Sequence, residues 1–576
     1  MTTSGSGKEA GDAVKRIIVV GGSAAGPKAA ARARRLDEHA DITIIQKAPD
    51  LSMASCGYPY YVGGFFDDRN MLLCTPTGVV RSPAFYLKAK GIKARTETEV
   101  VAIDRAGKTV TAKDLRTGEH ETLPYDKLIL STGALPRMPP IPGIDLEGVT
   151  TLQSMQDADF LRKVRDEKKI RKAVIIGGGL IGVETCEALR LAGLETTLVE
   201  LLPQCLTFLD WQLARLVQNH IEGHGAKVIT GNGISKLIGE GGRLVGVELN
   251  DGARIDCELA VVAIGVVPNT QLAREVGLEL GATGGVLVDE HMQTSDPDIL
   301  AAGDCVEVRR ILGGELVHAP YGDLANLEGR VAGENAIRPG SATFKGTFQT
   351  GICKIFDYAA GSTGLSERSA SAAFPGDVET VINASPDKPG FMTGKLLVTK
   401  LVVERSSGRI LGAQCIGPGD VSKQIAIWAM ALKGGLTVDD MACADLPYAP
   451  PFSLAIDHSI ATAHIMQNKL RGLMKSVSAM ELKEKLDAGL EPFILDMRGP
   501  DEYEEMRLGV GERLIPLGTL RDRLEELPAD KGAEIICFCK ISLRGYEAAR
   551  VLEMRGWTNV KVLEGGIMAW PYPRER

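Results

Sequence analysis

The sequence predicts a multidomain α/β protein. Twice, a short apolar run ends in a glycine-rich turn, continues as a helix and is followed by a second apolar run, and a third alternation of strands and helices follows residue 470. Alternation of this kind is typical of parallel sheets covered by helices. With 576 residues, the chain is long enough for about three to five domains.

The composition is that of an ordinary globular protein, with 44% hydrophobic and 24% charged residues, which excludes extensive disorder. The net charge of −8 gives no basic field, so we expect no nucleic-acid partner. Apolar stretches are interrupted well before ~18 residues, so we expect no membrane-spanning helix and no membrane partner. Residues 1–15 lack the apolar core of a secretory signal and are interpreted as a flexible tail. The 11 cysteines are scattered, which fits a reducing compartment and predicts a cytoplasmic protein.

The first nucleotide-binding pattern begins with the apolar run 17–20. The turn GGSAAG at 21–26 follows, then an alanine- and arginine-rich helix and a second apolar run at 42–45. Such a turn lets the backbone approach a pyrophosphate, whose charge is met by the N–H groups and dipole of the helix start. This is a loosened Rossmann-like pattern, and a tight turn into a packed helix is the alternative. The candidate binding residues are Gly21, Gly22, Ala24, Ala25 and Gly26.

The same Rossmann-like pattern recurs at 173–200 with all three glycines present. The turn at 177–182 reads GGGLIG, and Glu200 ends the next apolar run, 21 positions after Gly179. An acid about 20 residues after the glycines accepts the ribose hydroxyls of a dinucleotide. Because a carboxylate repels a 2′-phosphate, we favour NADH, with NADPH as the alternative. The candidate binding residues are Gly177, Gly179, Gly182, Glu184 and Glu200.

Two dinucleotide sites in one chain imply a bound flavin and a diffusing nicotinamide. Two apolar runs that end in small residues, LILSTGA at 128–134 and ILAAGD at 299–304, support this. Together with AIGVVPN at 263–269, they make residues 16–465 resemble the flavin-dependent pyridine nucleotide–disulfide oxidoreductases. The resemblance implies FAD, and Gln46 and Lys47 lie where that family usually has a glutamate for the adenosine ribose. Further candidates for FAD binding are Ser131, Thr132, Gly133, Gly265 and Asp304.

Cys56 follows the first pattern in the segment SMASCGYPYY at 52–61. Dithiol reductases of the family carry a second cysteine at the position of Tyr61. Cys56 therefore has no near neighbour for a disulfide, and its redox partner must be an oxygen, as in a sulfenate, or a sulfur brought by the substrate. The segment resembles that of the coenzyme A-disulfide and persulfide reductases, a single-cysteine branch. A branch that reduces oxygen or peroxide carries a histidine where this chain has Ala24, so sulfur substrates are favoured.

Two later segments, QTGICKIFD at 349–357 and DLPYAPPF at 445–452, resemble the α+β dimerisation domain of the same branch. The resemblance implies a homodimer in which the phenol of Tyr448 reaches the partner subunit's Cys56 and donates to a leaving thiolate. A packing aromatic residue is the alternative for Tyr448.

A small thiol or persulfide is the expected substrate, and coenzyme A is a further candidate ligand. Lys28, Arg32 and Arg35 share one face of the first helix, where they would meet substrate phosphates or form a solvated basic face. Ser52 and Ser55 match branch positions near the thiol. Three departures argue against strict coenzyme A specificity. Phe391 and Met392 lie where relatives have a Tyr-Tyr-Pro segment, Ile456 replaces a lysine and Ser55 replaces the common asparagine.

The C-terminal region contains an apolar run that ends in Cys539 and is followed by a helix. Converging N–H groups and the cations Lys540 and Arg544 would lower the pKa of such a thiol and stabilise an anionic adduct. The segments LDMR at 495–498, IPL at 515–517 and LEGGIMAW at 563–570 make this region resemble α/β rhodanese (sulfurtransferase) domains. The resemblance implies a persulfide on Cys539, although Ser542 replaces a loop glycine. An inactive regulatory rhodanese is the alternative.

These patterns divide the chain into a tail, three oxidoreductase domains, a linker and a sulfurtransferase domain. We expect the FAD-binding domain at 16–150 and 270–345, the NAD-binding domain at 151–269, the dimerisation domain at 346–468, the linker at 469–477 and the rhodanese domain at 478–576.

The expected function is FAD-dependent NAD(P)H reduction of persulfides, polysulfide or coenzyme A disulfides through Cys56, coupled to sulfur transfer at Cys539. The alternatives are an NADH oxidase or peroxidase that uses a Cys56 sulfenate, and a redox-sensing sulfur-binding protein. We expect no metal site. His220 and His224 have helical i, i+4 spacing, but Gly223 suggests that the helix is ending and no third ligand is near in sequence.

Overall fold

The computed structural model describes residues 14–575, and residues 1–13 of the expected tail lie outside them. The described residues form two compact units. Unit 1 comprises residues up to 140, 150–170 and 262–347, and unit 2 comprises 141–149, 171–261 and 348 onwards. The segment 141–149, which we expected in the FAD-binding domain, groups with unit 2, and the segments 151–170 and 262–269, which we expected in the NAD-binding domain, group with unit 1. One reason is that Arg162 of α4 (Met155–Glu167) donates to the Tyr61 carbonyl of α2 (Tyr58–Gly63) at 2.9 Å.

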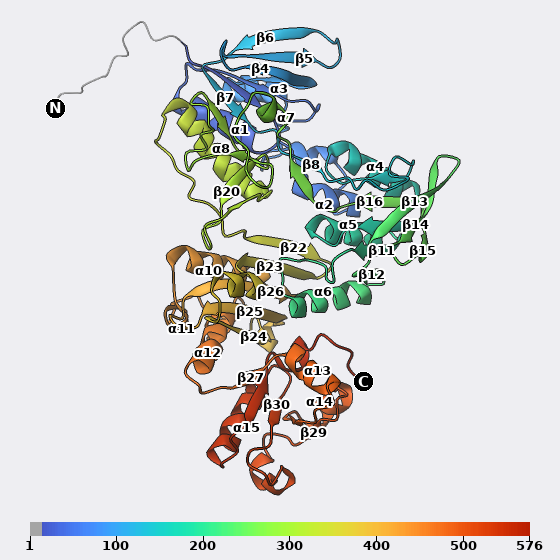
Figure 1. Cartoon of the computed structure of the whole chain (residues 1–576), viewed down its shortest axis with the longest axis vertical. Helices are drawn as coiled ribbons and strands as arrows, with labels where there is room; N and C mark the ends of the chain where they lie inside the picture. Colours follow the sequence, from blue (N-terminus) through green and yellow to red (C-terminus); the bar gives the residue numbers. More distant parts are fainter. Residues whose placement is uncertain (1–13, 576) are drawn as a thin grey trace, which may run out of the picture. The chain divides into compact units, whose positions relative to one another are not determined.

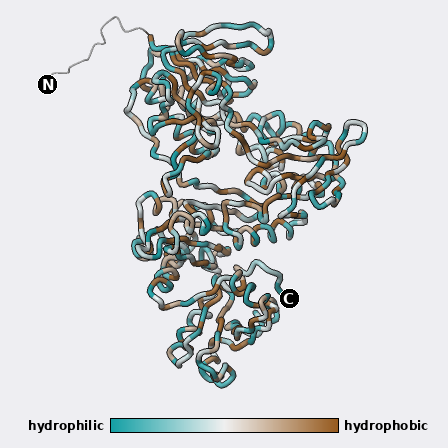
Figure 2. Tube along the Cα trace, in the orientation of Figure 1, coloured by the Kyte–Doolittle hydropathy of each residue, from teal (hydrophilic) through white to brown (hydrophobic). Residues whose placement is uncertain are grey.

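Unit 1 is built on a five-stranded parallel sheet with the strand order β19-β7-β1-β2-β3. Apolar residues fill the strands and appear brown in Figure 2, as expected for a sheet buried on both faces. Helices α1 and α8 pack together beside this sheet (Figure 1). The element bounds are β1 Arg16–Val20, α1 Ala25–Leu36, β2 Asp41–Ile45, α3 Pro83–Lys90, β3 Lys93–Arg95, β7 Lys127–Leu130, β19 Ile299–Ala301 and α8 Gly322–Ile337.

The register of the unit 1 sheet brings the carboxyl ends of four strands to one edge. Val20 of β1 pairs with Ile45 of β2 and Leu130 of β7, and Leu130 pairs with Ala301 of β19. Ligands of open parallel sheets bind at this edge. An antiparallel sheet of β4 (Thr98–Asp104), β5 (Thr109–Asp114) and β6 (His120–Pro124) completes the larger elements of unit 1.

Unit 2 repeats the nucleotide-binding arrangement. Strand β10 pairs in parallel with β11, and β11 with β12, and helix α5 follows β10 directly. A small antiparallel sheet of β13, β14 and β15 follows. The bounds are β10 Lys172–Ile176, α5 Leu180–Leu191, β11 Glu195–Glu200, α6 Trp211–Gly223, β12 Lys227–Thr230, β13 Ile234–Glu240, β14 Arg243–Leu249, β15 Arg254–Asp256 and β16 Leu259–Val262.

The following region of unit 2 is an antiparallel sheet with the order β22-β23-β26-β25-β24, and helices α10 and α12 pack on it. Neighbouring strands run antiparallel, and apolar residues such as Leu401 and Val402 are buried. The bounds are β22 Gly351–Ile355, β23 Tyr358–Gly364, β24 Val378–Pro386, β25 Leu396–Glu404, β26 Ile410–Gly417, α10 Val421–Gly434, α11 Val438–Ala442 and α12 His458–Leu470.

The C-terminal part of unit 2 is a parallel sheet with the order β27-β31-β30-β28-β29 (Figure 1). Phe538 at the end of β30 pairs with Asp496 at the end of β28, so Cys539 begins the loop at the carboxyl edge. The bounds are β27 Ser476–Val477, α13 Ala479–Asp487, β28 Phe493–Asp496, α14 Pro500–Glu505, β29 Arg513–Leu514, β30 Ile535–Phe538, α15 Leu543–Met554 and β31 Val560–Leu563. Throughout residues 14–575, no helix combines the length and apolar character needed to cross a bilayer.

Candidate active site

The first glycine turn is tightly packed, and its glycines carry no side chains that would keep a ligand away. Gly21 has φ +109°, and a Cβ there would lie 2.0 Å from the Ser131 carbonyl oxygen. A Cβ on Gly26 would lie 2.0 Å from the Gly21 carbonyl oxygen, so both positions require glycine. No side chain caps α1 at Ala24, which leaves its first N–H groups to an anion.

Gln46 is tied to the first glycine turn. The Gly22 N–H donates to Gln46 Oε1 at 2.8 Å, and Gln46 Nε2 donates to the Asp50 carbonyl at 3.3 Å. Lys47 is exposed and forms an ion pair with Glu99 at 2.8 Å. Gln46 therefore shapes the turn while staying at the edge where an adenosine ribose would lie, whereas the Lys47 ammonium is directed to a surface carboxylate.

Ser131, Thr132 and Gly133 form the neighbouring loop. Ser131 Oγ donates to the Val20 carbonyl at 2.9 Å, and Thr132 Oγ1 donates to the Asn269 carbonyl at 2.6 Å. The Asn269 N–H donates to the Gly133 carbonyl at 2.9 Å. This loop is thereby fixed to β1 and to the segment after Gly265, where the Arg137 N–H donates to the Gly265 carbonyl at 2.9 Å.

Asp304 lies after β19 at the same sheet edge. Burial raises the pKa of its carboxyl, and no hydrogen bond reaches that carboxyl from any residue in 14–575. The carboxylate is partly exposed at this edge, so it can accept a hydrogen bond from a ligand hydroxyl. Glu328 of α8, which the sequence did not single out, accepts the Gly303 N–H at 2.7 Å and holds the turn before Asp304. Burial raises the pKa of Glu328 to about 8.

Cys56 is exposed on a 3-10 turn, Ser55–Gly57, that leads into α2. Its Sγ lies close to the start of α8, 3.6 Å from where a Cβ on Gly322 would be. None of the 11 cysteines, all of which lie in the described residues, forms a disulfide, and Tyr61 is buried in α2. The adjacent Tyr58 is also buried, with no hydrogen-bond partner for its hydroxyl among the described residues. Unit 1 thus exposes the Cys56 thiol next to a short helix whose Tyr58 and Tyr61 are buried.

The neighbours of Cys56 have different surroundings. Ser52 has φ +52°, its N–H donates to the Gly22 carbonyl at 2.7 Å, and its carbonyl accepts from Arg81 at 3.0 Å. Ser52 therefore fastens the thiol segment to the glycine turn. Ser55 is exposed, like Cys56.

The basic face of α1 is only partly available to a substrate. The Arg32 guanidinium pairs with Glu334 of α8 at 2.6 Å, and both side chains are about four-fifths buried. Lys28 is half-buried and Arg35 is exposed. The Arg32 charge is therefore already paired within the protein, whereas those of Lys28 and Arg35 have no ion-pair partner among the described residues.

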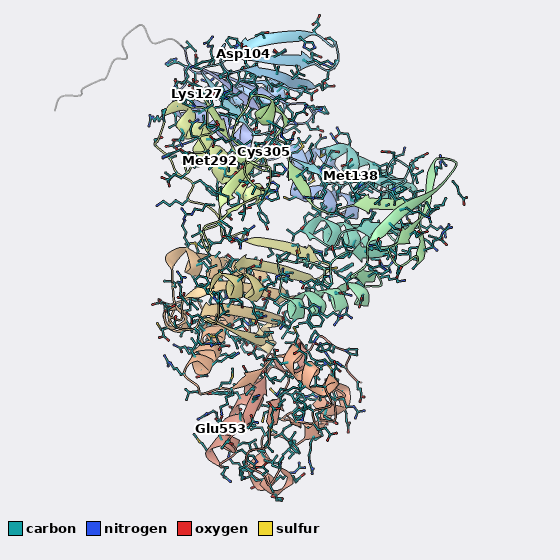
Figure 3. All side chains as sticks on the ribbon, in the orientation of Figure 1. Asp104, Lys127, Met138, Met292, Cys305 and Glu553 are labelled. Carbon is teal, nitrogen blue, oxygen red and sulfur yellow. The ribbon has the colours of Figure 1, made fainter. Side chains whose placement is uncertain are left out.

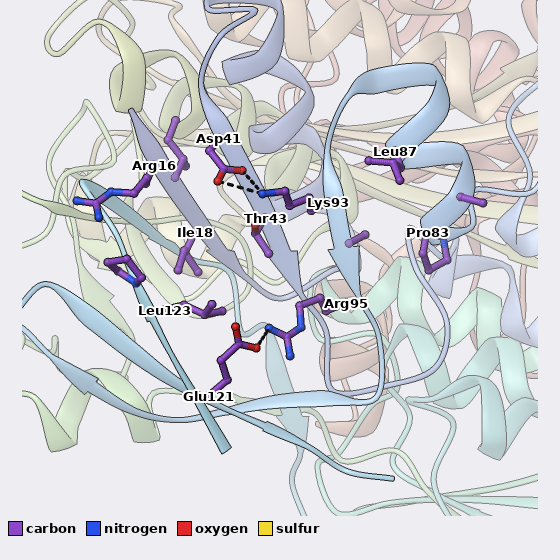
Figure 4. A pocket seen from close by; sticks show the side chains of 14 residues that line it. Arg16, Ile18, Asp41, Thr43, Pro83, Leu87, Lys93, Arg95, Glu121 and Leu123 are labelled. Carbon is purple, nitrogen blue, oxygen red and sulfur yellow. Dashed lines mark hydrogen bonds and ion pairs between the residues drawn. The ribbon is translucent and has the colours of Figure 1, made fainter. Parts of the chain in front are cut away.

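Unit 1 also has a hollow away from the predicted site, against its parallel sheet (Figure 4). Its lining includes Arg16, Asp41, Lys93, Arg95 and Glu121. Its charged groups are paired, with Lys93–Asp41 at 2.8 Å and Arg95–Glu121 at 2.6 Å. Arg16 and Asp41 begin their strands and Arg95 ends β3, so the hollow runs along one face of the sheet, beside α3 and β6. None of the predicted site residues lines it, and we assign it no role. Cys305, labelled in Figure 3, is wholly buried and belongs to the core.

The second glycine turn, in unit 2, mirrors the first. Gly177 has φ +109°, and α5 begins after Gly179 without a side-chain cap. Glu200 Oε2 accepts the Gly178 N–H at 2.6 Å, and Oε1 accepts the Leu202 N–H at 2.8 Å. Gly182 is buried in α5, and Glu184 lies one turn into that helix, partly exposed. The Glu200 carboxylate is therefore positioned at the strand end, as Gln46 is in unit 1.

We predict that Glu200→Gln raises the ratio of NADPH to NADH efficiency about tenfold or more. The substitution removes the charge that repels a 2′-phosphate but keeps an acceptor for Gly178, and tenfold corresponds to about 1.4 kcal/mol. Steady-state kinetics with both nucleotides measures the ratio. Glu195→Gln, at the exposed start of the same strand, is the matched control. An unchanged ratio in Glu200→Gln would count against this role.

Cys539 begins the loop between β30 and α15 and is buried. The Arg544 guanidinium forms two hydrogen bonds to Glu502, at 2.6 and 2.8 Å, and thereby lowers the pKa of Glu502 to about 2. Arg544 also interacts with Cys539, whose negative form contributes to raising the pKa of the arginine. Glu502, which the sequence did not single out, therefore fixes the cation beside the thiol.

The Cys539 loop has the left-handed turn for which glycine is expected. Ser542 has φ +78°, and its Oγ donates to the Leu563 carbonyl at 2.6 Å. The hydrogen bond offsets part of the strain of a non-glycine residue in this conformation. A Cβ on Gly566 would lie 2.3 Å from the Cys539 carbonyl oxygen, so the LEGG segment packs against the loop.

Glu564 connects the C-terminal part to the antiparallel sheet of unit 2. Its Oε2 accepts the Ile382 N–H of β24 at 3.0 Å, and its Oε1 accepts from Lys469 at 2.8 Å and from Ser476 at 2.6 Å. Glu564 is buried, and its position next to Gly565 ties the loop around Cys539 to a neighbouring domain. Tyr448, by contrast, lies on an exposed loop between α11 and α12.

Two glycine turns at the carboxyl edges of parallel sheets, an exposed thiol beside the first of them and a second thiol in a C-terminal α/β domain are typical of a flavin- and pyridine-nucleotide-dependent class of oxidoreductase. The pyridine nucleotide-disulphide oxidoreductase family matches residues 15–321, and its dimerisation domain matches 350–460. The chain belongs to this family and carries a rhodanese-like domain at 478–571. The family implies FAD and NAD(P)H, and the dimerisation domain indicates a homodimer.

The similarity to known proteins extends over most of the chain. The structure of an NAD-dependent persulfide reductase from A. fulgidus is 40% identical, with a TM-score of 0.91, and the match covers 96% of this chain and 100% of that one. The NAD(P)H coenzyme A polysulfide/persulfide reductase of Pyrococcus horikoshii is 32% identical over 79% of this chain and 98% of that protein. A protein of Methanocaldococcus jannaschii named NADH oxidase is 32% identical over 76% of this chain and 96% of that protein.

Proposed function

We propose that this protein is an FAD-dependent NADH reductase of low-molecular-weight persulfides and polysulfides. The observation that carries the proposal is the exposed Cys56 thiol, which lies beside the start of α8 in unit 1 and forms no disulfide. A redox thiol that is not joined to a second protein cysteine exchanges with a sulfur or oxygen from the substrate. The similarity to a persulfide reductase and to a coenzyme A polysulfide/persulfide reductase favours sulfur.

The carboxyl edge of the unit 1 sheet fits FAD. The Gly21–Gly26 turn and the uncapped α1 would receive the pyrophosphate, Gln46 the adenosine ribose, and Asp304 the ribityl hydroxyls. FAD bound there supplies a two-electron carrier between a nicotinamide and a sulfur. Gly177–Gly182 and Glu200 would hold NADH in unit 2.

The chemistry assigned to Cys56 is nucleophilic. Its thiolate attacks the inner sulfur of a persulfide RSSH, forming Cys56–S–S–R and releasing HS⁻. Two electrons then cleave that disulfide, returning the Cys56 thiolate and RSH. The overall reaction is RSSH + NADH + H⁺ → RSH + H₂S + NAD⁺. Tyr448 of the partner subunit would donate a proton to the leaving sulfur.

Cys539 would accept a sulfane sulfur as a persulfide, next to Arg544, and pass it to or from a small thiol. Having both sites in one chain raises the local concentration of the transferred species. Coenzyme A is one candidate thiol, with Lys28, Arg35 and Ser55 available near the Cys56 segment. Ile456 and Phe391, both exposed where relatives have a lysine and a tyrosine, favour a site that also accepts smaller thiols.

The test is anaerobic turnover with NADH and a panel of glutathione persulfide, coenzyme A persulfide, inorganic polysulfide and coenzyme A disulfide. We expect NADH consumption matched by equal sulfide release with the persulfides, and slower consumption without sulfide for the disulfide. A parallel assay with oxygen or peroxide checks the oxidase alternative. Turnover only with oxygen or peroxide would overturn the proposal, and no steady-state turnover with any acceptor would favour a sensor.

A further inference from the structure

Three side chains of the kinds that bind metal ions lie close together in unit 2. They are far in sequence from Cys56 and Cys539. His220 lies in α6, His224 lies at the end of that helix, and Asp357 lies on the turn between β22 and β23, elements that can be followed in Figure 1. One ligand atom from each residue lies within 4.8 Å of the other two. The helix ends at Gly223, as expected from the sequence, but His224 still lies one turn after His220, on the same side of the helix end. Asp357 provides the third group, which is too far away in the sequence to have been recognised there.

The distances suit a transition-metal ion. Asp357 Oδ1 lies 3.0 Å from His220 Nε2 and 3.7 Å from His224 Nε2. Tetrahedral ligands at the usual zinc bond lengths are separated by about 3.3 Å. His220 Nε2 is buried, and it lies close to Asp357 Oδ1, with which it forms an ion pair without a hydrogen bond of good geometry. An ion between the three atoms would satisfy all of them.

The imidazole orientations are those of metal ligands. His224 Nδ1 lies 3.0 Å from the His220 carbonyl, and the Ile355 carbonyl accepts a hydrogen bond from His220. Ligating histidines usually donate their second ring N–H to a carbonyl in this way, which leaves the Nε2 lone pair free for the ion. Aromatic rings fix both planes, with Tyr358 stacked on His220 at 3.7 Å and Phe356 on His224 at 4.1 Å.

We propose that His220, His224 and Asp357 form a binding site for a divalent transition-metal ion, with Zn²⁺ as the first choice. Two imidazoles and one carboxylate exclude hard cations such as Mg²⁺, which prefer oxygen ligands. The Asp357 side chain is 64% exposed, so solvent reaches the ion and fills its remaining coordination positions. The binding is therefore exchangeable and reversed by a chelator.

The ion would tie α6 to the β22–β23 hairpin beside the C-terminal segment. Asn219 of α6 donates to the Pro571 carbonyl at 3.0 Å, and Trp211 contacts Tyr572 with ring centroids 5.6 Å apart. Metal binding would then stabilise the contacts among α6, the hairpin and the C-terminal segment, and raise the midpoint temperature of unfolding.

The test uses the full-length flavoprotein, dialysed against EDTA and then titrated with ZnCl₂ by calorimetry. Wild type and the control His120→Gln, an exposed histidine on β6, should bind one zinc more per chain than His224→Gln and Asp357→Asn, or bind it at least about tenfold more tightly. Zinc taken up by thiols is the same in all four proteins and cancels.

A second readout is the thermal midpoint with and without zinc, with circular dichroism and flavin content verifying the fold of each variant. We expect zinc to raise the midpoint of wild type and His120→Gln, and MgCl₂ to have no such effect. Asp357 lies on an exposed turn, so its substitution by asparagine preserves the fold even if a histidine variant does not. Equal zinc stoichiometry, affinity and midpoint shift in all four proteins would overturn the proposal.

Discussion

Replacing Cys56 by serine is expected to lower NADH-dependent persulfide reduction by about 10³-fold or more, while flavin binding is retained. A hydroxyl is far less ionised and less nucleophilic than a thiol at neutral pH, so the exchange with substrate sulfur stops. The flavin edge does not depend on the thiol, because Gly21, Gln46 and Asp304 lie on other segments. Anaerobic steady-state kinetics and sulfide release measure the loss.

The matched control for this substitution is Cys443→Ser, which makes the same change at an exposed free cysteine after α11. It should turn over within about twofold of wild type. Reduction of bound flavin by NADH alone should persist in Cys56→Ser, since that step precedes the thiol chemistry. Persulfide turnover within a few-fold of wild type in Cys56→Ser would refute the assigned role.

The parts of the site that the sequence predicted are those encoded in contiguous segments. The two glycine turns could be recognised because strand, turn and helix follow each other within about 30 residues, and the backbone demands of Gly21 and Gly177 are local. The fold class, the family and the rhodanese-like domain were predicted on the same basis and are confirmed by the family matches. Ser542 is a further example of a local requirement. Its backbone has the left-handed conformation at the position where a glycine was expected.

The parts that sequence reasoning missed are long-range partners. Glu328 supports the Asp304 turn, Glu502 holds Arg544, and Glu564 anchors the segment beside Cys539, yet each lies 25 to 182 positions from a group that it binds. A surface glutamate in a helix has the same local pattern as any of these. Arg32 shows what local reasoning leaves out: it shares a helix face with Lys28 and Arg35, but it forms an ion pair with Glu334 of α8.

Replacing Cys539 by serine is expected to abolish sulfur transfer while sparing reduction of a small free persulfide at Cys56. The rhodanese-like domain has its own carboxyl edge, loop and cation, so its chemistry can be separated from the flavin-dependent reaction. With thiosulfate as donor and cyanide as acceptor, thiocyanate formation should fall about 10³-fold, because the sulfur-carrying thiol is gone. Anaerobic NADH turnover with glutathione persulfide should stay within about twofold.

Cys537→Ala is the matched control, since it removes the buried thiol two residues earlier on β30 and leaves the loop residue in place. Burial raises the pKa of Cys537 strongly, so that thiol is inert as a nucleophile. Mass spectrometry after thiosulfate treatment should find one added sulfur on the Cys539 peptide of wild type and Cys537→Ala, and none in Cys539→Ser. An equal thiocyanate rate in Cys539→Ser would make the domain a regulatory module, and a parallel loss of persulfide reduction would mean that sulfur reaches Cys56 only through Cys539.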